Sequence, residues 1–279
     1  MSAPAPERVP GGGGLAPALA AVRARSGLVA ALFVLAGVGW WWTVRRMEGM
    51  DGGPWTALGT LGWFLSVWVV MTAAMMFPSV APTVALYSRM TRRRSPLSPP
   101  LFVAGYLLAW TAAGLLAFAL LTIVTRAAGD VLAWDRAGRW VAGATLLVAA
   151  VYELTPLKDV CLGRCRSPLG YLLGSWREGR WGALRMGAGH GAWCVGCCWA
   201  LMAALFALGV MSVVWMAVVA ALIAVEKTLP WRRVATWGTT AVLLTLGLLV
   251  LTAPQAVPAL TVPGADGTGG MEPMGAAPP

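Results

Sequence analysis

The only histidine of this chain and three of its five cysteines lie within nine residues, in the segment HGAWCVGCCWALM at positions 190–202. On a helix these four side chains fall within about 100° of arc, so one face carries an imidazole and three thiols. The four residues are His190, Cys194, Cys197 and Cys198. Soft and borderline metal ions such as Cu(I) and Zn(II) prefer thiolate and imidazole ligands. The segment therefore predicts a site for such an ion.

Two further cysteines precede this segment. Cys161 and Cys165 are spaced i, i+4, as neighbours on one helical face would be. Their proximity in sequence to the histidine and cysteine segment suggests that both groups lie on the same side of the protein. We therefore include them as candidate metal ligands.

Methionines supply a third group of soft donors, in MTAAMMFPSVAP at positions 71–82. Met71 and Met75 share a helical face, and Met76 lies beside it. Thioethers bind Cu(I) well and harder ions poorly, although methionine is also an ordinary core residue. Pro78 removes a backbone donor and predicts a kink just beyond the methionines. Combined with the cysteine segment, the methionines favour copper.

The elements that must position these residues are apolar helices. Of 279 residues, 58% are hydrophobic and 11% are charged, which is too apolar for an ordinary soluble domain. Runs long enough to cross a bilayer must be helical in lipid. We expect an all-α, polytopic transmembrane helix bundle of about seven spans. The expected spans are 28–44, 61–87, 101–125, 138–154, 191–208, 210–225 and 234–251, with a tight turn near Gly209.

Lysines and arginines indicate the orientation of these spans. Counted by loop, 16 lie on the side of the N-terminus and 5 on the other side. The positive-inside rule therefore predicts a cytoplasmic N-terminus and an outer C-terminus (N-in/C-out). The net charge of +10 is explained by these loops meeting anionic lipid headgroups, rather than by nucleic acid.

The expected organisation has three parts. Residues 1–27 are rich in Pro, Gly and Ala and predict a disordered cytoplasmic segment. Residues 28–251 form the transmembrane domain, with a basic inner loop at 155–189. Within this loop a short helix in the headgroup plane is predicted by the spacing of Leu169, Leu172, Leu173 and Trp176. Residues 252–279 form a flexible Pro/Gly-rich tail.

Several ionisable residues stand at the ends of the spans. These are Glu153, Lys158, Asp159, Glu226 and Lys227. At such positions they can reach water, so we expect anchoring or ion pairing, with Glu226 the residue that faces the bundle interior. No phosphate loop, nucleotide fingerprint or serine-hydrolase elbow is evident. A single histidine also restricts acid–base catalysis, and we expect no enzyme activity.

Four motifs resemble a bacterial family described as predicted metal-binding integral membrane proteins, some of them copper-chaperone-like. The motifs are MTAAMMFPSVAP (71–82), YELTPLKDVCLGRCRSPLGYLL (152–173), GALRMGAGHGAWCVGCCWALM (182–202) and EKTLP (226–230). The resemblance implies a multi-pass protein of the bacterial inner membrane that handles copper, as in a branch associated with copper supply to a tyrosinase. It implies the ligands His190, Cys194, Cys197 and Cys198, and more weakly the methionines and the cysteine pair. Arg164 stands where members often have a histidine, and it cannot bind metal.

The leading hypothesis is a membrane copper chaperone that delivers Cu(I) to a copper enzyme or another membrane protein. A membrane thiol–disulfide oxidoreductase is one alternative, although the cytoplasm keeps thiols reduced. A structural membrane subunit is another. It would hold zinc between four ligands, for example Cys161, Cys165, Cys194 and Cys198, or pack its cysteines without metal.

Overall fold

The computed structural model describes residues 22–23, 25–47, 59–91, 95–128, 137–209 and 212–257. In these residues the regular structure is helical throughout, so the expected all-α class is confirmed. The helices are α2 (Ser26–Met47), α3 (Leu61–Thr91), α4 (Ser98–Ala128), α5 (Arg139–Glu153), α6 (Pro156–Arg166), α7 (Pro168–Gly174), α8 (Gly179–Leu208), α9 (Val213–Thr228), α10 (Arg232–Thr252) and the 3-10 turn η2 (Pro254–Ala256). Most of the predicted N-terminal segment and the tail after residue 257 lie outside the described residues.

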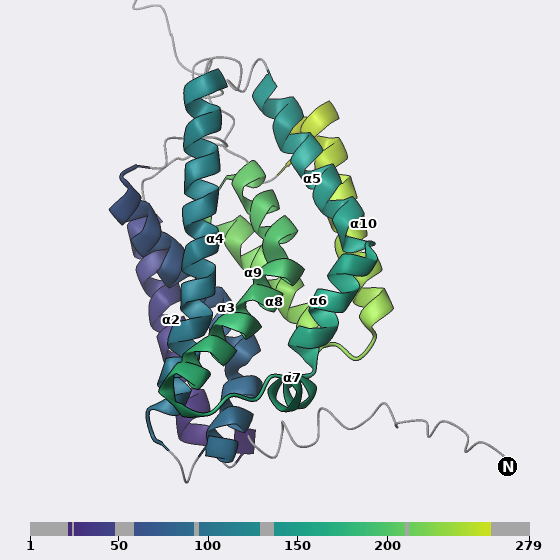
Figure 1. Ribbon diagram of the computed structural model, residues 1–279. Helices are drawn as coiled ribbons and strands as arrows, with labels where there is room; N and C mark the ends of the chain where they lie inside the picture. Colours follow the sequence, from purple (N-terminus) through teal and green to yellow (C-terminus); the bar gives the residue numbers. More distant parts are fainter. Residues whose placement is uncertain are drawn as a thin grey trace, which may run out of the picture.

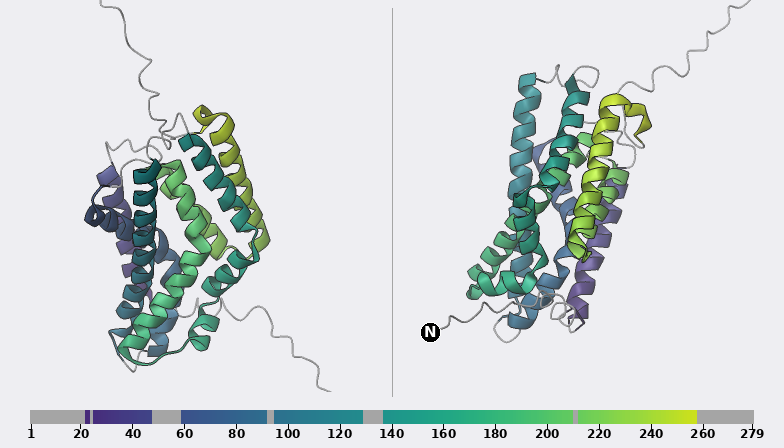
Figure 2. Two further views of the ribbon diagram at one scale, coloured as in Figure 1. Left: turned by 45° about the horizontal axis from the view of Figure 1, so that its top comes forward. Right: turned by 90° about the vertical axis from the view of Figure 1, so that its right-hand side faces the viewer.

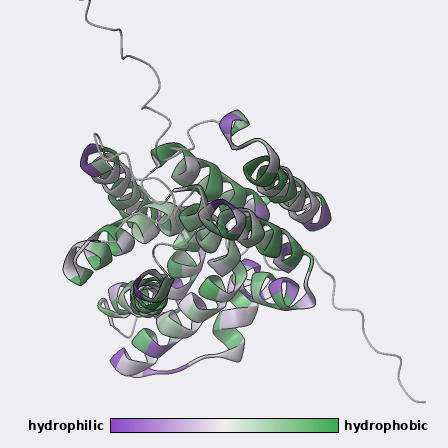
Figure 3. Cartoon of the chain, turned by 90° about the horizontal axis from the view of Figure 1, so that it is seen from above, coloured by the Kyte–Doolittle hydropathy of each residue, from purple (hydrophilic) through white to green (hydrophobic). Residues whose placement is uncertain are grey.

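Five helices are long and apolar enough to cross a membrane: α2, α3, α4, α8 and α10. Helices α5 and α6 pass the same test together, as a pair bent by 68°. The sixth expected span, 210–225, corresponds to α9, which has only 16 residues. Hydrophobic ribbon predominates when the bundle is viewed from above (Figure 3). The architecture is therefore consistent with a membrane protein, whereas the count of seven spans and the N-in orientation stay predictions.

The long helices alternate in direction around α8 (Figures 1 and 2). Helix α4 packs along α8 most extensively, and α2 and α3 lie beyond it on the same flank. Helices α5 and α10 pair on the opposite flank, and α6 packs against α8. Helix α8, which carries the histidine and three of the cysteines, thus occupies the middle of the bundle.

The stretch predicted as the inner loop 155–189 is mostly helical. Helix α5 stops at Glu153, and Thr155 caps α6 by accepting a hydrogen bond from the Lys158 backbone N–H at 3.3 Å. Pro156 occupies the first position of α6, where its missing N–H costs nothing. The change of direction at this cap turns α6 toward α8.

Helix α8 begins at Gly179, twelve residues before the expected start of its span. The added turns bury small and apolar residues, while their arginines remain outside the core. The segment is therefore amphipathic, and its mean hydropathy is too low to mark it as part of an apolar span. The predicted short helix is present as α7, with Leu172 buried and Leu173 exposed, whereas Trp176 lies beyond its end. Figure 1 shows α7 end-on, across the direction of the long helices.

Helices α4 and α8 approach closely because a glycine of each helix lies against the backbone of the other. A Cβ atom at Gly187 would collide with the Phe102 carbonyl, and one at Gly105 with the Leu184 carbonyl. Small residues are the usual means of close helix contact in membranes. This contact brings Tyr106 of α4 beside Cys194 of α8, with 3.0 Å between the hydroxyl oxygen and Sγ.

The structure bears on two local features expected from the sequence. Helix α3 continues through Pro78 and Pro82 to Thr91, so the methionine helix spans the proline at which a kink is predicted. The expected turn near Gly209 is confirmed, because α8 ends at Leu208 and Gly209 has a φ of 106°. That left-handed backbone favours glycine and separates α8 from α9.

We expect Gly187→Ala to destabilise the protein by about 1–3 kcal/mol, the usual cost of adding a methyl group to a packed interface. Gly238→Ala on α10 is the matched control, because its Cβ would meet nothing within 4 Å. Replacing glycine by alanine in an open helix position is stabilising by up to about 1 kcal/mol. Thermal unfolding of the detergent-purified variants measures both effects. Equal midpoints for the two variants would contradict the close approach of α4 and α8.

Candidate metal centre

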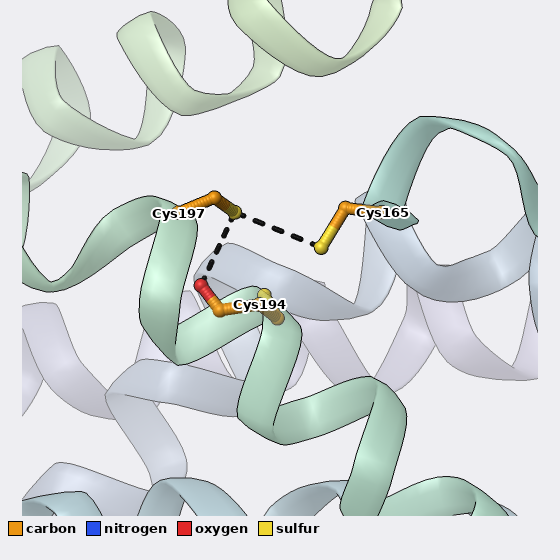
Figure 4. A group of neighbouring side chains, drawn as sticks. All are labelled: Cys165, Cys194 and Cys197. Atoms are coloured by element: carbon orange, nitrogen blue, oxygen red, sulfur yellow. Dashed lines mark hydrogen bonds between the residues drawn. The ribbon is translucent and has the colours of Figure 1, made fainter. Parts of the chain in front are cut away.

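Three thiols from two helices converge beside α8. The sulfurs of Cys165 on α6 and of Cys194 and Cys197 on α8 all lie within 4.8 Å of one another (Figure 4). The sulfurs of Cys165 and Cys197 are 3.7 Å apart, and the Cys197 thiol donates a hydrogen bond to the Cys194 carbonyl at 3.2 Å. We call these three residues the sulfur cluster. Its spacing allows one ion to contact all three sulfurs after small side-chain movements.

A fourth thiol adjoins the cluster. The sulfur of Cys198 lies 3.3 Å from that of Cys197, and all five cysteines of the chain are free thiols. Cys194, Cys197 and Cys198 are each at most 2% exposed, whereas Cys165 is partly exposed. The α8 thiols are therefore enclosed, whereas the Cys165 residue has part of its surface open.

Helices α3, α4 and α9 complete the surroundings of Cys194. Its sulfur lies 3.0 Å from the Tyr106 hydroxyl oxygen and accepts a hydrogen bond from Lys227 Nζ at 3.1 Å. The same ammonium group lies 3.4 Å from Ser79 Oγ and 3.9 Å from Met76 Sδ. A cation from α9 and a hydroxyl group from α4 thus contact Cys194, and the hydroxyl and thioether groups of α3 contact that cation.

His190 is buried at 3% exposure but is not part of the sulfur cluster. Its ring lies among Tyr171, Phe102 and Tyr106, at centroid distances of 4.9, 6.0 and 6.1 Å. Its Nδ1 atom has no hydrogen-bond partner within the described part of the chain. The histidine and the three cysteines are thus all buried along α8, but the histidine packs in an aromatic pocket apart from the sulfur cluster.

The two remaining predicted groups are each divided by the structure. Of the three methionines, Met76 reaches the surroundings of the cluster through Lys227, while Met71 and Met75 are buried in the hydrophobic core along α3. Of the cysteine pair, Cys165 joins the cluster, whereas Cys161 lies against Gly196 of α8. A Cβ atom at Gly196 would lie 2.9 Å from the Cys161 sulfur, so the glycine provides the room for this thiol.

The aromatic pocket at His190 is fixed from α7. The Tyr171 hydroxyl donates a hydrogen bond to the Met186 carbonyl at 2.6 Å. Burial raises the pKa of Tyr171 to about 12, so the hydroxyl keeps its proton and remains a donor at neutral pH. Arg164 turns away from this region and lies over the Trp193 ring, 5.4 Å from its centroid.

A buried group of charges holds α6 and α9 in place. The Lys158 ammonium pairs with Glu153 and with Glu226, at 2.7 Å from Glu226 Oε2, and all three side chains are at most 2% exposed. Ion pairing and the inward position of Glu226 are confirmed, but these groups do not reach water at the span ends. Arg166 of α6 also donates to the Glu226 and Leu229 carbonyls of α9. These contacts fix the helix of Cys165 against the helix of Lys227.

Lys227 and Tyr106 are functional candidates that the sequence did not single out as parts of the site. The adjacency of Glu226 and Lys227 in EKTLP was a usable signal, because consecutive residues on a helix point about 100° apart. One of the two could face the charge group while the other faced the cysteines. No comparable signal marks Tyr106.

Comparison with protein-family models shows to which family the chain belongs. The family described as "PpoB2: Copper chaperone" matches residues 65–250, which include the whole sulfur cluster. No curated protein and no solved structure matches the chain.

We expect Lys158→Met to lower the free energy of unfolding by about 3–5 kcal/mol, because two buried carboxylates would lose their cation. Arg232→Met is the control. It removes an ion pair with Asp159, 2.9 Å long, between side chains that are 42% and 48% exposed, and it should cost less than about 1 kcal/mol. Denaturant or thermal unfolding in detergent compares the two. Similar small losses would show that the buried charges do not hold the helices together.

Proposed function

Because the chain belongs to this copper-chaperone family, we propose that it binds Cu(I) at the sulfur cluster within the bacterial inner membrane and delivers the ion to a copper enzyme. The observation that carries the proposal is the convergence of Cys165, Cys194 and Cys197 within 4.8 Å of one another. Thiolates are the protein ligands that Cu(I) prefers. Copper is the cargo of this protein, and no catalytic reaction is proposed.

The composition of the cluster favours Cu(I) over zinc. Structural zinc takes four ligands in a closed tetrahedron. The group found among the described residues has three thiols, and neither His190 nor Cys161 belongs to it. The set Cys161, Cys165, Cys194 and Cys198 therefore makes a poor zinc site.

The positions of the four thiols suggest how the ion moves. Cys165 is partly exposed and stands on the short helix α6, whereas Cys194 and Cys197 are buried on α8. We propose that Cys165 exchanges the ion with the partner, and that Cys194 and Cys197 retain it. Cys198, 3.3 Å from Cys197, and Met76 supply further soft donors nearby.

We expect the double variant Cys194→Ser, Cys197→Ser to lower the Cu(I) affinity by about 100-fold or more, equivalent to about 2.7 kcal/mol, because two thiolate ligands are lost. Cys161→Ser is the matched control, since this thiol lies against Gly196 outside the cluster. Anaerobic competition with a chromophoric Cu(I) chelator measures both affinities. Equal losses in the two variants, or bound zinc that Cu(I) cannot displace, would overturn the assignment.

Delivery has a separate test. The full-length protein is loaded with Cu(I) in detergent and mixed with the apo form of a copper-dependent enzyme. It should activate that enzyme even when a chelator prevents activation by free copper. Cys165→Ser should slow this transfer by about tenfold or more while weakening binding less than the Cys194 and Cys197 changes do, because it removes the accessible ligand. Activation that depends only on the free copper concentration would contradict delivery by this protein.

A further inference from the structure

The Lys227 ammonium group lies among sulfur and hydroxyl groups. It is 3.1 Å from Cys194 Sγ, 3.4 Å from Ser79 Oγ and 3.9 Å from Met76 Sδ. These three residues come from two helices, α8 and α3, and Lys227 itself comes from α9. A cationic group is thus built into the centre that is proposed to bind a cation.

The negative charge that matches Lys227 has to come from the thiols. Glu226, its neighbour in sequence, turns to Lys158 together with Glu153, at exposures of at most 2%. Within the described part of the chain, the ion pairs of Lys227 do not include a carboxylate. A buried charge is costly unless an opposite charge compensates it. Thiolates of the sulfur cluster are therefore the natural partners of this ammonium group.

Charge counting shows which ion such an arrangement accommodates. The proposed function leaves the retained ion on two thiolates, those of Cys194 and Cys197. These two thiolates and Cu(I) carry a net charge of −1, and the ammonium of Lys227 brings the total to zero. Two thiolates and Zn(II) are already neutral, so the same ammonium leaves an excess of +1. In a surrounding of low polarity the neutral combination is the more stable one.

We propose that Lys227 is a specificity-determining residue, which compensates the charge of a two-thiolate Cu(I) complex and so makes the centre prefer a monovalent to a divalent soft ion. This inference rests on the proposed function, since it assumes that the ion is bound at the sulfur cluster. Lys227 acts through its charge and not as a ligand. Ser79 accepts a hydrogen bond from the ammonium and can keep it beside the cluster when Cys194 binds the ion.

Two substitutions separate the charge from the bulk of the side chain. Lys227→Gln removes the charge and keeps a polar chain of similar length, whereas Lys227→Arg keeps the charge. Affinities of the full-length protein for Cu(I) and for Zn(II) are measured in detergent by anaerobic competition with chelators. We expect Lys227→Gln to weaken Cu(I) binding by about tenfold or more and to leave Zn(II) binding unchanged or tighter. Lys227→Arg should retain most of the preference for Cu(I).

The possible outcomes distinguish this inference from the proposed function. Equal losses for the two ions would show that Lys227 is structural, and an unchanged or increased Cu(I) affinity would show that its charge does not help; either result overturns the inference alone. Failure of the unmodified protein to bind Cu(I) would overturn both proposals. If the Lys227→Gln protein does not fold, Lys227→Leu takes its place with the same expected result. Ser79→Ala is the control: it keeps the charge of Lys227 and should leave Cu(I) bound more tightly than Zn(II).

Discussion

The sulfur cluster depends on the bend between α5 and α6. If the two helices continued in one line, α6 would follow α5 along the flank of the bundle, and Cys165 would not reach α8. The bend of 68° at residues 154–155 lays α6 across α8 instead. Thr155 and Pro156 fix the start of the second helix, and the Lys158 pairs with Glu153 and Glu226 tie both sides of the bend to α9. A local helix cap and a buried charge group therefore decide which thiol joins the cluster.

The middle of α8 has to pack closely against α4 and α6. Gly187 and Gly105 let α4 and α8 approach backbone to backbone, while Gly196 leaves room for the sulfur of Cys161. This close packing brings the Tyr106 hydroxyl of α4 within hydrogen-bond distance of Cys194, which Lys227 of α9 also reaches. The bundle thus encloses a polar and sulfur-rich centre in a predominantly apolar protein.

Much of this arrangement could be predicted from the sequence, because it follows from periodicity. The helical class and the common face of Cys194 and Cys197 rest on local spacing. The pairing of the charges near the span ends followed from their positions beside apolar runs, although its partners, such as Lys158 and Glu226, lie 68 residues apart. The choice between Cys161 and Cys165 could not be predicted in this way. Residues at i and i+4 share a face, and the docking of α6 on α8 determines which of the two meets the cluster.

His190 and Lys227 illustrate the same limit for single residues. The sequence identifies both residues, but the orientation of each side chain depends on residues that are distant along the chain. Tyr171 and Phe102 enclose the imidazole, and Ser79 and Cys194 receive the ammonium. Hydropathy also placed the start of α8 too late, because glycines and arginines lower the average over a helix whose buried side is small and apolar.

The partial exposure of Cys165 has a kinetic consequence. Under the proposed function, an acceptor protein would form its first bond to the ion at this sulfur without separating the long helices, since Cys165 lies on α6, a helix of only 11 residues. In the same proposal, the buried thiols of Cys194 and Cys197 on α8 would hold the ion until it is transferred. The rate of hand-over would be governed by local fluctuations of one short segment, and the rest of the molecule could stay rigid throughout.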